Sequence, residues 1–133
     1  MDAALIALTD RGVRFTFRGE PFRSRRDIPN EEILDINFSH VDITDADVEA
    51  LLPLVNLEGI SFWKTRVSDR AIELISQLPR ITRLNLCGTQ VTDALVSVLA
   101  GMELSYIDVA DTGISAQGVE TLRQQLPTAE ILV

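Results

Sequence analysis

Cys87 and His40, the single cysteine and the single histidine, are the side chains best suited to nucleophilic catalysis. A thiol nucleophile needs a base within hydrogen-bond reach. The strand pattern described below puts the two residues two strands apart, about 10 Å along the stacking direction. We therefore expect His40 to be a solvated turn residue and the chain not to be an enzyme. Cys87 is either a reactive outward thiol or a small residue that fills a strand position.

Acidic residues recur at the starts of three expected helices, at Asp45, Asp47, Asp69 and Asp93. Carboxylates in such numbers could bind calcium. Each group follows a Ser or Thr, however, and an acid at a helix start is stabilised by the free N–H groups and the helix dipole. We expect a line of capping residues along one edge. One cysteine is too few for a Cys-based zinc site and the seven glycines are scattered, so neither a metal nor a cofactor is expected.

The only tryptophan and the only tyrosine both fall at outward positions of the expected strands. Tryptophan, tyrosine and arginine are the residue types that contribute most to protein interfaces. The pattern predicts a partner-binding surface centred on Trp63, Arg83, Asn85 and Tyr106. The complete predicted set is Trp63, Arg83, Asn85, Tyr106, Asp108, Asn37, Ser61 and Cys87. In the alternative interpretation, Trp63 folds over its own loop and packs on a neighbour.

Charge is unevenly distributed along the chain, whose formal net charge is -8. Residues 1–30 contain six arginines against four acids, whereas residues 31–133 contain six basic and sixteen acidic residues. This balance opposes binding to nucleic acid, which requires a basic footprint. Within the head, "FRSRR" makes Arg23, Arg25 and Arg26 a secondary candidate site for an anion or an acidic partner. The alternative is a solvated loop, or one paired with the chain's own acids.

The elements that position these residues come from an internal repeat. Four blocks align without gaps: "ILDINFSHVDITD" from 33, "LEGISFWKTRVSD" from 57, "ITRLNLCGTQVTD" from 81 and "LSYIDVADTGISA" from 104. Their central apolar residues, Ile36, Ile60, Leu84 and Ile107, are 24, 24 and 23 positions apart, and Ile131 of "AEILV" follows 24 later. A fixed period of this length is typical of stacked repeat proteins.

Each block reads L-x-x-L-x-L-x-x-T-x-V-[ST]-D, which resembles the leucine-rich repeat, in particular the short bacterial type with a "TxVTD" signature. The cysteine-containing repeats of F-box proteins are more distantly similar. The resemblance covers residues 33–133, with starts near 33, 57, 81 and 104 and a partial copy at 128. It departs from the pattern at Val41, where other blocks have Thr, and at Ala116, where they have Asp. The resemblance implies an α/β right-handed solenoid with a parallel concave sheet, outer helices and a protein-binding role.

The physical pattern of one block gives the same order of elements. Alternating apolar residues predict a short strand, Thr-x-Val a corner, and the Ser or Thr before each acid a helix cap. The first helix is expected to face inward through Val48, Leu51, Leu52 and Val55. Residues 1–32 form a separate head: "AALIALTDRG" predicts a helix ended by Gly12, and "VRFTF" a strand. We expect this head to cap residues 33–133.

Taken together, the sequence predicts a non-enzymatic module that binds a protein or peptide on its concave sheet. The alternative is an assembly subunit that dimerises through an uncapped C-terminal edge, because an unpaired strand edge can pair with another copy. No apolar run reaches the length of a membrane span and the start is too short and acidic for a signal peptide, so the cytoplasm is the expected compartment and no membrane partner is expected.

Overall fold

The computed structural model describes residues 1–18 and 27–133. Its elements follow one another as helices and short strands in near-regular alternation. In chain order they are α1 (Ala3–Asp10), β1 (Arg14–Phe17), η2 (Asn30–Glu32), β2 (Ile33–Asn37), α2 (Asp45–Val48), η3 (Glu49–Leu51), β3 (Gly59–Ser61), α3 (Asp69–Ile75), β4 (Arg83–Asn85), η4 (Asp93–Leu95), α4 (Val96–Ala100), β5 (Tyr106–Asp108), α5 (Ala116–Gln125) and β6 (Glu130–Leu132).

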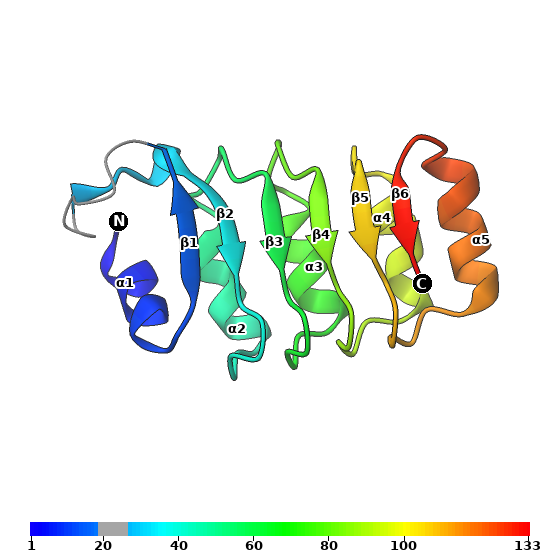
Figure 1. Ribbon diagram of the computed structural model, residues 1–133, viewed down its shortest axis with the longest axis horizontal. Coiled ribbons are helices and arrows are strands. Elements are labelled where there is room, and N and C mark those ends of the chain that lie inside the picture. The colour runs from blue at the N-terminus through cyan, green and yellow to red at the C-terminus, as the bar shows by residue number, and fades with distance from the viewer. Residues whose placement is uncertain (19–26) are drawn as a thin grey trace.

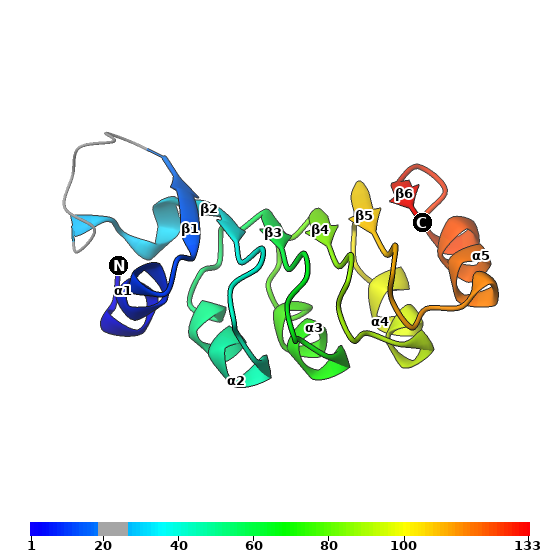
Figure 2. The same cartoon turned by 60° about the horizontal axis from the view of Figure 1, so that its bottom comes forward.

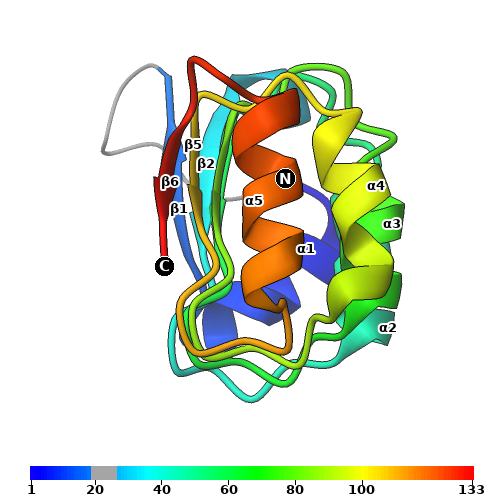
Figure 3. The ribbon, with the colours of Figure 1, turned by 90° about the vertical axis from the view of Figure 1, so that its right-hand side faces the viewer.

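The strands form one six-stranded sheet in the order β1-β2-β3-β4-β5-β6. Strands β2 to β6 are parallel and in register, so that Ile36, Ile60, Leu84, Ile107 and Ile131 lie side by side. The labelled helices all lie against one face of this sheet, as Figures 2 and 3 show. The opposite face is covered by no described helix, and Figure 1 shows the strands in sequence from β1 to β6.

The predicted fold class, a right-handed leucine-rich repeat solenoid with a parallel sheet, is wrong. β1 pairs with β2 antiparallel, so the sheet is mixed, and it is open rather than closed. The chain is a mixed α/β fold with one antiparallel pair and four parallel pairs of strands. The repeat could not predict this pairing, because β1 lies in the head, outside the repeated blocks whose common order of strand and helix makes β2 to β6 parallel.

The core lies between the sheet and the helices. The central strand residues Ile36, Ile60, Leu84 and Ile107 are buried, as the alternation predicts. Phe38 and Phe62 follow the ends of β2 and β3 and stack with their ring centroids 5.3 Å apart. Burial of these side chains against their neighbours supplies most of the stability, because no three-residue strand or single turn of helix is stable alone.

The helix of the first block, α2, is shorter than the inward positions from Val48 to Val55 predict. α2 contains only Asp45–Val48 and is followed by the 3-10 turn η3, which ends at Leu51. Val48 and Leu51 are buried as expected, but Val55 is 47% exposed. The chain turns at Pro53 instead of continuing as a helix, and this removes Val55 from the inward face.

Each corner after a strand uses the same backbone conformation. His40, Lys64, Gly88 and Asp111 occupy equivalent positions in the four blocks, and all have positive φ, between 52° and 74°. One residue later, Thr65, Thr89 and Thr112 donate their hydroxyl protons to the carbonyl three residues back, at 2.6–2.8 Å. The Thr of the "TxV" signature is therefore a hydrogen-bonding corner residue.

The repeated aspartates do more than stabilise their own helix starts. Asp45 accepts hydrogen bonds from the backbone N–H and the hydroxyl of Ser68, and Asp69 does the same with Thr92. Asp93 accepts from the N–H of Ser115. We call these three aspartates and their partners Ser68, Thr92 and Ser115 the corner ladder. Each rung ties one block to the cap residue of the next, a link between blocks that the sequence pattern did not predict.

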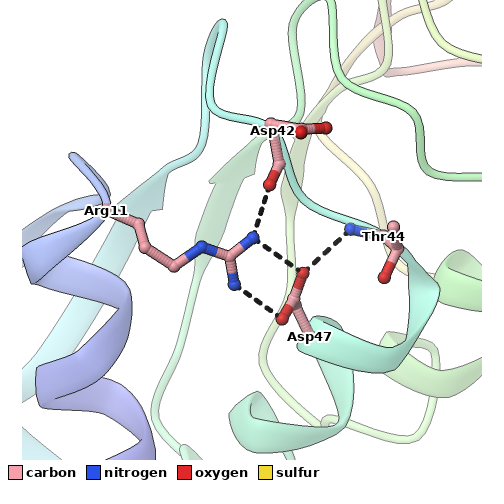
Figure 4. A network of polar contacts seen from close by, with 4 residues as sticks. All are labelled: Arg11, Asp42, Thr44 and Asp47. Carbon is pink, nitrogen blue, oxygen red and sulfur yellow. Dashed lines mark hydrogen bonds and ion pairs between the residues drawn. The ribbon is translucent and has the colours of Figure 1, made fainter.

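The head is attached to the first block by one polar network. Arg11 forms an ion pair with Asp47 at 2.8 Å and donates to the carbonyl of Asp42, while Asp47 also accepts from the N–H of Thr44 (Figure 4). The guanidinium lowers the pKa of the Asp47 carboxyl below its usual value, chiefly through the hydrogen bond. Gly12 has φ of 97°, a conformation that lets the chain leave α1 and enter β1.

Candidate functional site

The sheet face away from the helices, here called the open face, carries two parallel rows of outward residues. The registers place them side by side from β1 to β6. The first row is Thr16, Asp35, Gly59, Arg83, Tyr106 and Glu130, and the second is Arg14, Asn37, Ser61, Asn85, Asp108 and Leu132. These positions differ in chemistry from strand to strand, unlike the core positions beneath them.

A shallow groove of about 580 Å³ crosses this face from β1 to β5. Five of the eight residues predicted to bind a partner line it: Arg83, Asn85, Tyr106, Asn37 and Ser61. The groove runs across the strands rather than along one of them, because its lining comes from five consecutive strands. It therefore offers an extended surface and not an enclosed cavity.

An ion pair spans the middle of the groove. Arg83 on β4 reaches over β3 to Asp35 on β2, with Nη2 and Oδ1 2.7 Å apart. The intervening position on β3 is Gly59, where a Cβ atom would lie 2.2 Å from that carboxylate oxygen and 3.0 Å from the guanidinium. Glycine at this position is what allows the two side chains to meet. The pair holds Arg83 across the groove floor.

Most second-row side chains also have a structural task. The side-chain oxygens of Asn37, Asn85 and Asp108 accept hydrogen bonds from the backbone N–H groups of residues 39, 87 and 110, at 2.8–3.0 Å. Ser61 forms a hydroxyl contact of 3.0 Å with Ser39. The three bonds to backbone N–H groups form Asx-type turns at the ends of β2, β4 and β5. They use one acceptor of each side chain, and the remaining amide or carboxylate atoms are available to a ligand.

Tyr106 is the aromatic residue of the groove. Its side chain is half-buried on β5, between Arg83 and Glu130 in the first row. Burial raises the pKa of the Tyr106 hydroxyl, and the negative charges of Asp108 and Glu130 raise it further, together with a smaller effect of Cys87. The phenol therefore stays protonated at neutral pH and lies within the electrostatic reach of two carboxylates.

The sequence pattern predicts Trp63 at the centre of the binding surface, but the structure places it outside the groove. It comes two residues after β3 ends and does not line the groove. Its ring contacts His40 edge-on, with centroids 4.7 Å apart, and the Lys64 ammonium lies 5.5 Å from the ring centroid. The side chain is 38% exposed. These contacts agree with the alternative interpretation, in which Trp63 folds over its own loop and packs on a neighbour.

The remaining predicted residues lie at the margins or outside the description. Asp108 belongs to the second row next to Asn85 but does not line the groove. Cys87 is a free, partly buried thiol two residues after the end of β4. The Arg-rich candidate, Arg23, Arg25 and Arg26, lies outside the described residues. Within the described residues, no three His, Cys, Asp or Glu side chains are grouped so as to hold a metal ion.

Several groove residues were not assigned to the site from the sequence, and three of them bear on its chemistry. Arg14, Asp35 and Gly59 all line the groove. The sequence carries a signal for Asp35 and Gly59. These two residues and Arg83 hold the same position in three successive blocks, so the glycine lies between two side chains of opposite charge. The sequence carries no such signal for Arg14. Its strand lies outside the repeated blocks and pairs antiparallel with β2, so the repeat does not align Arg14 with the other outward residues.

No protein-family model matches the chain. No curated protein matches it either. Among solved structures, the chain is similar to one titled "Structure of Chaetomium Mex67:Mtr2 subunits", with 16% identity over 74% of this chain and 78% of that chain and a TM-score of 0.53. At this identity the likeness concerns the fold alone. It does not bear on the resemblance to leucine-rich repeats, which stays a prediction.

Among the described residues, no helix has both the length and the apolar character needed to cross a membrane.

Proposed function

We propose that the chain is a non-enzymatic interaction module that binds a protein or peptide on the open face. The observation that supports this most directly is the groove, which brings Arg83, Asn85 and Tyr106 together on a face that no described helix covers. Tyrosine and arginine in one groove supply a rigid aromatic surface and several hydrogen-bond donors. The proposed partner is neither a nucleic acid nor a membrane, and the proposed compartment is the cytoplasm.

The size of the groove favours a segment of chain over a whole folded surface. A standard protein interface buries about 800 Å² per partner, which exceeds what a few three-residue strands present. An extended peptide needs less area, and it gains from a groove whose backbone is already ordered. The internal bonds of Asn37, Asn85 and Asp108 hold the strand ends in place before any ligand arrives.

Selection from a library of random dodecapeptides displayed on phage tests this proposal. The immobilised protein should select peptides whose binding is weakened about 30-fold or more by Tyr106→Ala, the effect of a typical interface hot spot. The matched control is Glu73→Ala, an exposed acid on α3 at the opposite face. Thermal unfolding should show that Tyr106→Ala changes stability by less than about 1 kcal/mol. Peptides that bind the variant and the wild type equally well would contradict the proposal.

The second candidate function is self-association through β6. Leu132 is 38% exposed and Val133 is 65% exposed, and β6 has no neighbour on its outer side within the described sheet. An exposed apolar edge strand is a ready template for pairing with another chain.

Sedimentation velocity at micromolar concentration separates the two functions. If β6 mediates assembly, the wild type sediments as a dimer and Leu132→Lys as a monomer, because the introduced charge blocks an edge. A wild-type monomer at every concentration would remove this candidate and leave peptide binding untouched.

A further inference from the structure

The open face has a charge gradient that runs along the groove. Arg14 stands on β1 at one end, and Asp108 and Glu130 stand on β5 and β6 at the other. None of these three forms an ion pair within the described part of the chain. In the middle, the pair of Asp35 and Arg83 is neutral. Among the described residues of the two rows, unpaired charge is therefore confined to the two ends, with opposite signs.

This gradient differs from the general acidity of the chain. With a net charge of -8 an acidic face would be expected, yet the charged residue that the two described rows have on β1 is Arg14. Tyr106 connects the groove to the acidic end, because it lines the groove and lies beside Glu130 in the first row. Glu130 is the register partner of Tyr106 on β6, and Asp108 lies two residues further along β5 on the same face; both carboxylates raise the pKa of the Tyr106 hydroxyl.

We propose that the groove binds an extended peptide that carries one acidic and one basic side chain, the acid over Arg14 and the base over Tyr106 between Asp108 and Glu130. This inference rests on the proposed function and specifies its ligand. A lysine or arginine there meets two carboxylates and an aromatic face, the surroundings that favour a cation. A carboxylate at the other end meets the exposed Arg14 guanidinium.

The geometry also sets the spacing of the two charges. Four strand spacings of about 4.8 Å separate β1 from β5, or about 19 Å in all. An extended chain advances about 3.3 Å per residue. The acidic and basic residues of the ligand should therefore be separated by about six positions. The direction of the peptide is set by which residue comes first, and both orders are covered by a random library.

The phage selection described above provides the first test. Selected dodecapeptides should be enriched in an acid and a base about six positions apart, in one of the two orders. Selected peptides without such a spacing would overturn this inference and leave the proposed peptide binding standing. If no peptide bound through Tyr106, the proposed function would fail, and the inference with it.

The second test uses one selected peptide, labelled with fluorescein, and its Lys→Gln version, measured by fluorescence anisotropy. The double variant Asp108→Asn with Glu130→Gln should weaken the lysine peptide about tenfold and leave the Lys→Gln peptide unchanged. Asn at 108 keeps the bond to the N–H of Ala110, since Asn85 makes the same bond to Cys87. The control, Glu73→Gln with Glu120→Gln, removes the same charge from the helices on the other face.

A charge reversal tests the other end of the groove. Arg14→Glu should weaken the selected peptide, and replacing the acid of the peptide by lysine should restore the binding that was lost. The affinity of the wild type for the selected peptide should fall as salt is raised, because the end charges are exposed. Equal losses for both peptides in the double variant, or no rescue by reversal, would overturn the charge-paired binding mode.

Discussion

The corner ladder and the open face are both rows of polar residues that cross the blocks, but they differ in how uniform they are. The ladder repeats one chemistry, with an aspartate that accepts from the cap residue of the next block. The first row of the open face changes at every strand, from Asp35 through Gly59 and Arg83 to Tyr106. Repeated polar residues of this kind satisfy the chain's own backbone, and varied ones leave atoms for a ligand.

This comparison also explains why the acidic residues do not form a metal site. Each ladder carboxylate is already occupied by donors of a neighbouring block, so its oxygens point along the row and not toward a common centre. In contrast, Asp108 and Glu130 on the open face have no cation partner among the described residues. Function is therefore expected where the pattern varies, and stability where it repeats.

The largest stability effect is expected from breaking one rung of the ladder. Asp69→Ala removes the acceptor of both the N–H and the hydroxyl of Thr92, at 2.8 and 2.6 Å, and should cost about 1.5 kcal/mol of unfolding free energy. Urea denaturation measures this change. Asp69→Asn keeps one acceptor oxygen and should recover part of the loss. If the alanine variant were as stable as wild type, the ladder would not contribute to stability as argued.

A smaller effect is expected at the buried corner threonine. Thr89→Val removes the hydroxyl bond of 2.7 Å to the carbonyl of Leu86 and keeps the shape of the side chain, so it should cost about 1 kcal/mol. The first block offers the reverse experiment, because Val41 occupies this position naturally. Val41→Thr should raise stability by a similar or smaller amount. Melting temperatures of the two variants check both signs, and a stabilised Thr89→Val would contradict the role of the hydroxyl.

The sequence predicted the strands of the blocks and the helix starts that carry the aspartates, but not the bonds of the corner ladder. The period of the blocks predicted where the strands β2 to β6 lie, because apolar alternation reports which residues face the core. An alternating pattern of apolar and polar residues is the same for a parallel and an antiparallel strand, however, so it could not show that β1 is antiparallel to β2. The partner of Asp69 was also hidden, since a side chain at a helix start can serve its own helix or the next block.

The site was predicted at the level of which residues face outward. Arg83, Asn85 and Tyr106 line the groove because the alternation of β4 and β5 put them there. Trp63 lies outside the groove, because β3 ends at Ser61 and the tryptophan belongs to the turn that follows. The sequence also did not predict the positive φ at His40, Lys64 and Asp111, which hold the same position as Gly88 in their blocks. Of these four residues, only glycine indicates such a conformation by its type.

A third prediction concerns pH and the attachment of the head. The pKa of Asp47 is lowered in the folded chain by Arg11, so the pair stabilises the fold above the pKa of an unfolded aspartate, about 3.9. This stabilisation is lost as the pH falls through the lower, folded pKa. Arg11→Gln should therefore be less stable than wild type at pH 7, and the difference should shrink toward pH 3. Urea midpoints at the two pH values measure it, and a constant difference would contradict the assignment.

The smallest stability effect, with a large effect on binding, is expected at Gly59. In Gly59→Ala the new Cβ would lie 2.2 Å from the Asp35 oxygen and 3.0 Å from the Arg83 guanidinium, so the ion pair must open. Both side chains are partly exposed and flexible, with side-chain exposures of 39% and 45%, so the fold should lose only about 0.5 kcal/mol. The groove floor nevertheless changes, because Arg83 no longer crosses it, and peptides selected on the wild type should bind at least about fivefold more weakly.

Anisotropy titration with the selected peptide, together with thermal unfolding, separates the two effects of Gly59→Ala. Ala94→Gly, an exposed site in η4, is the matched control for changing glycine content. Unchanged peptide affinity in Gly59→Ala would show that the bridging pair has no part in recognition, and that even varied positions of the open face can be purely structural.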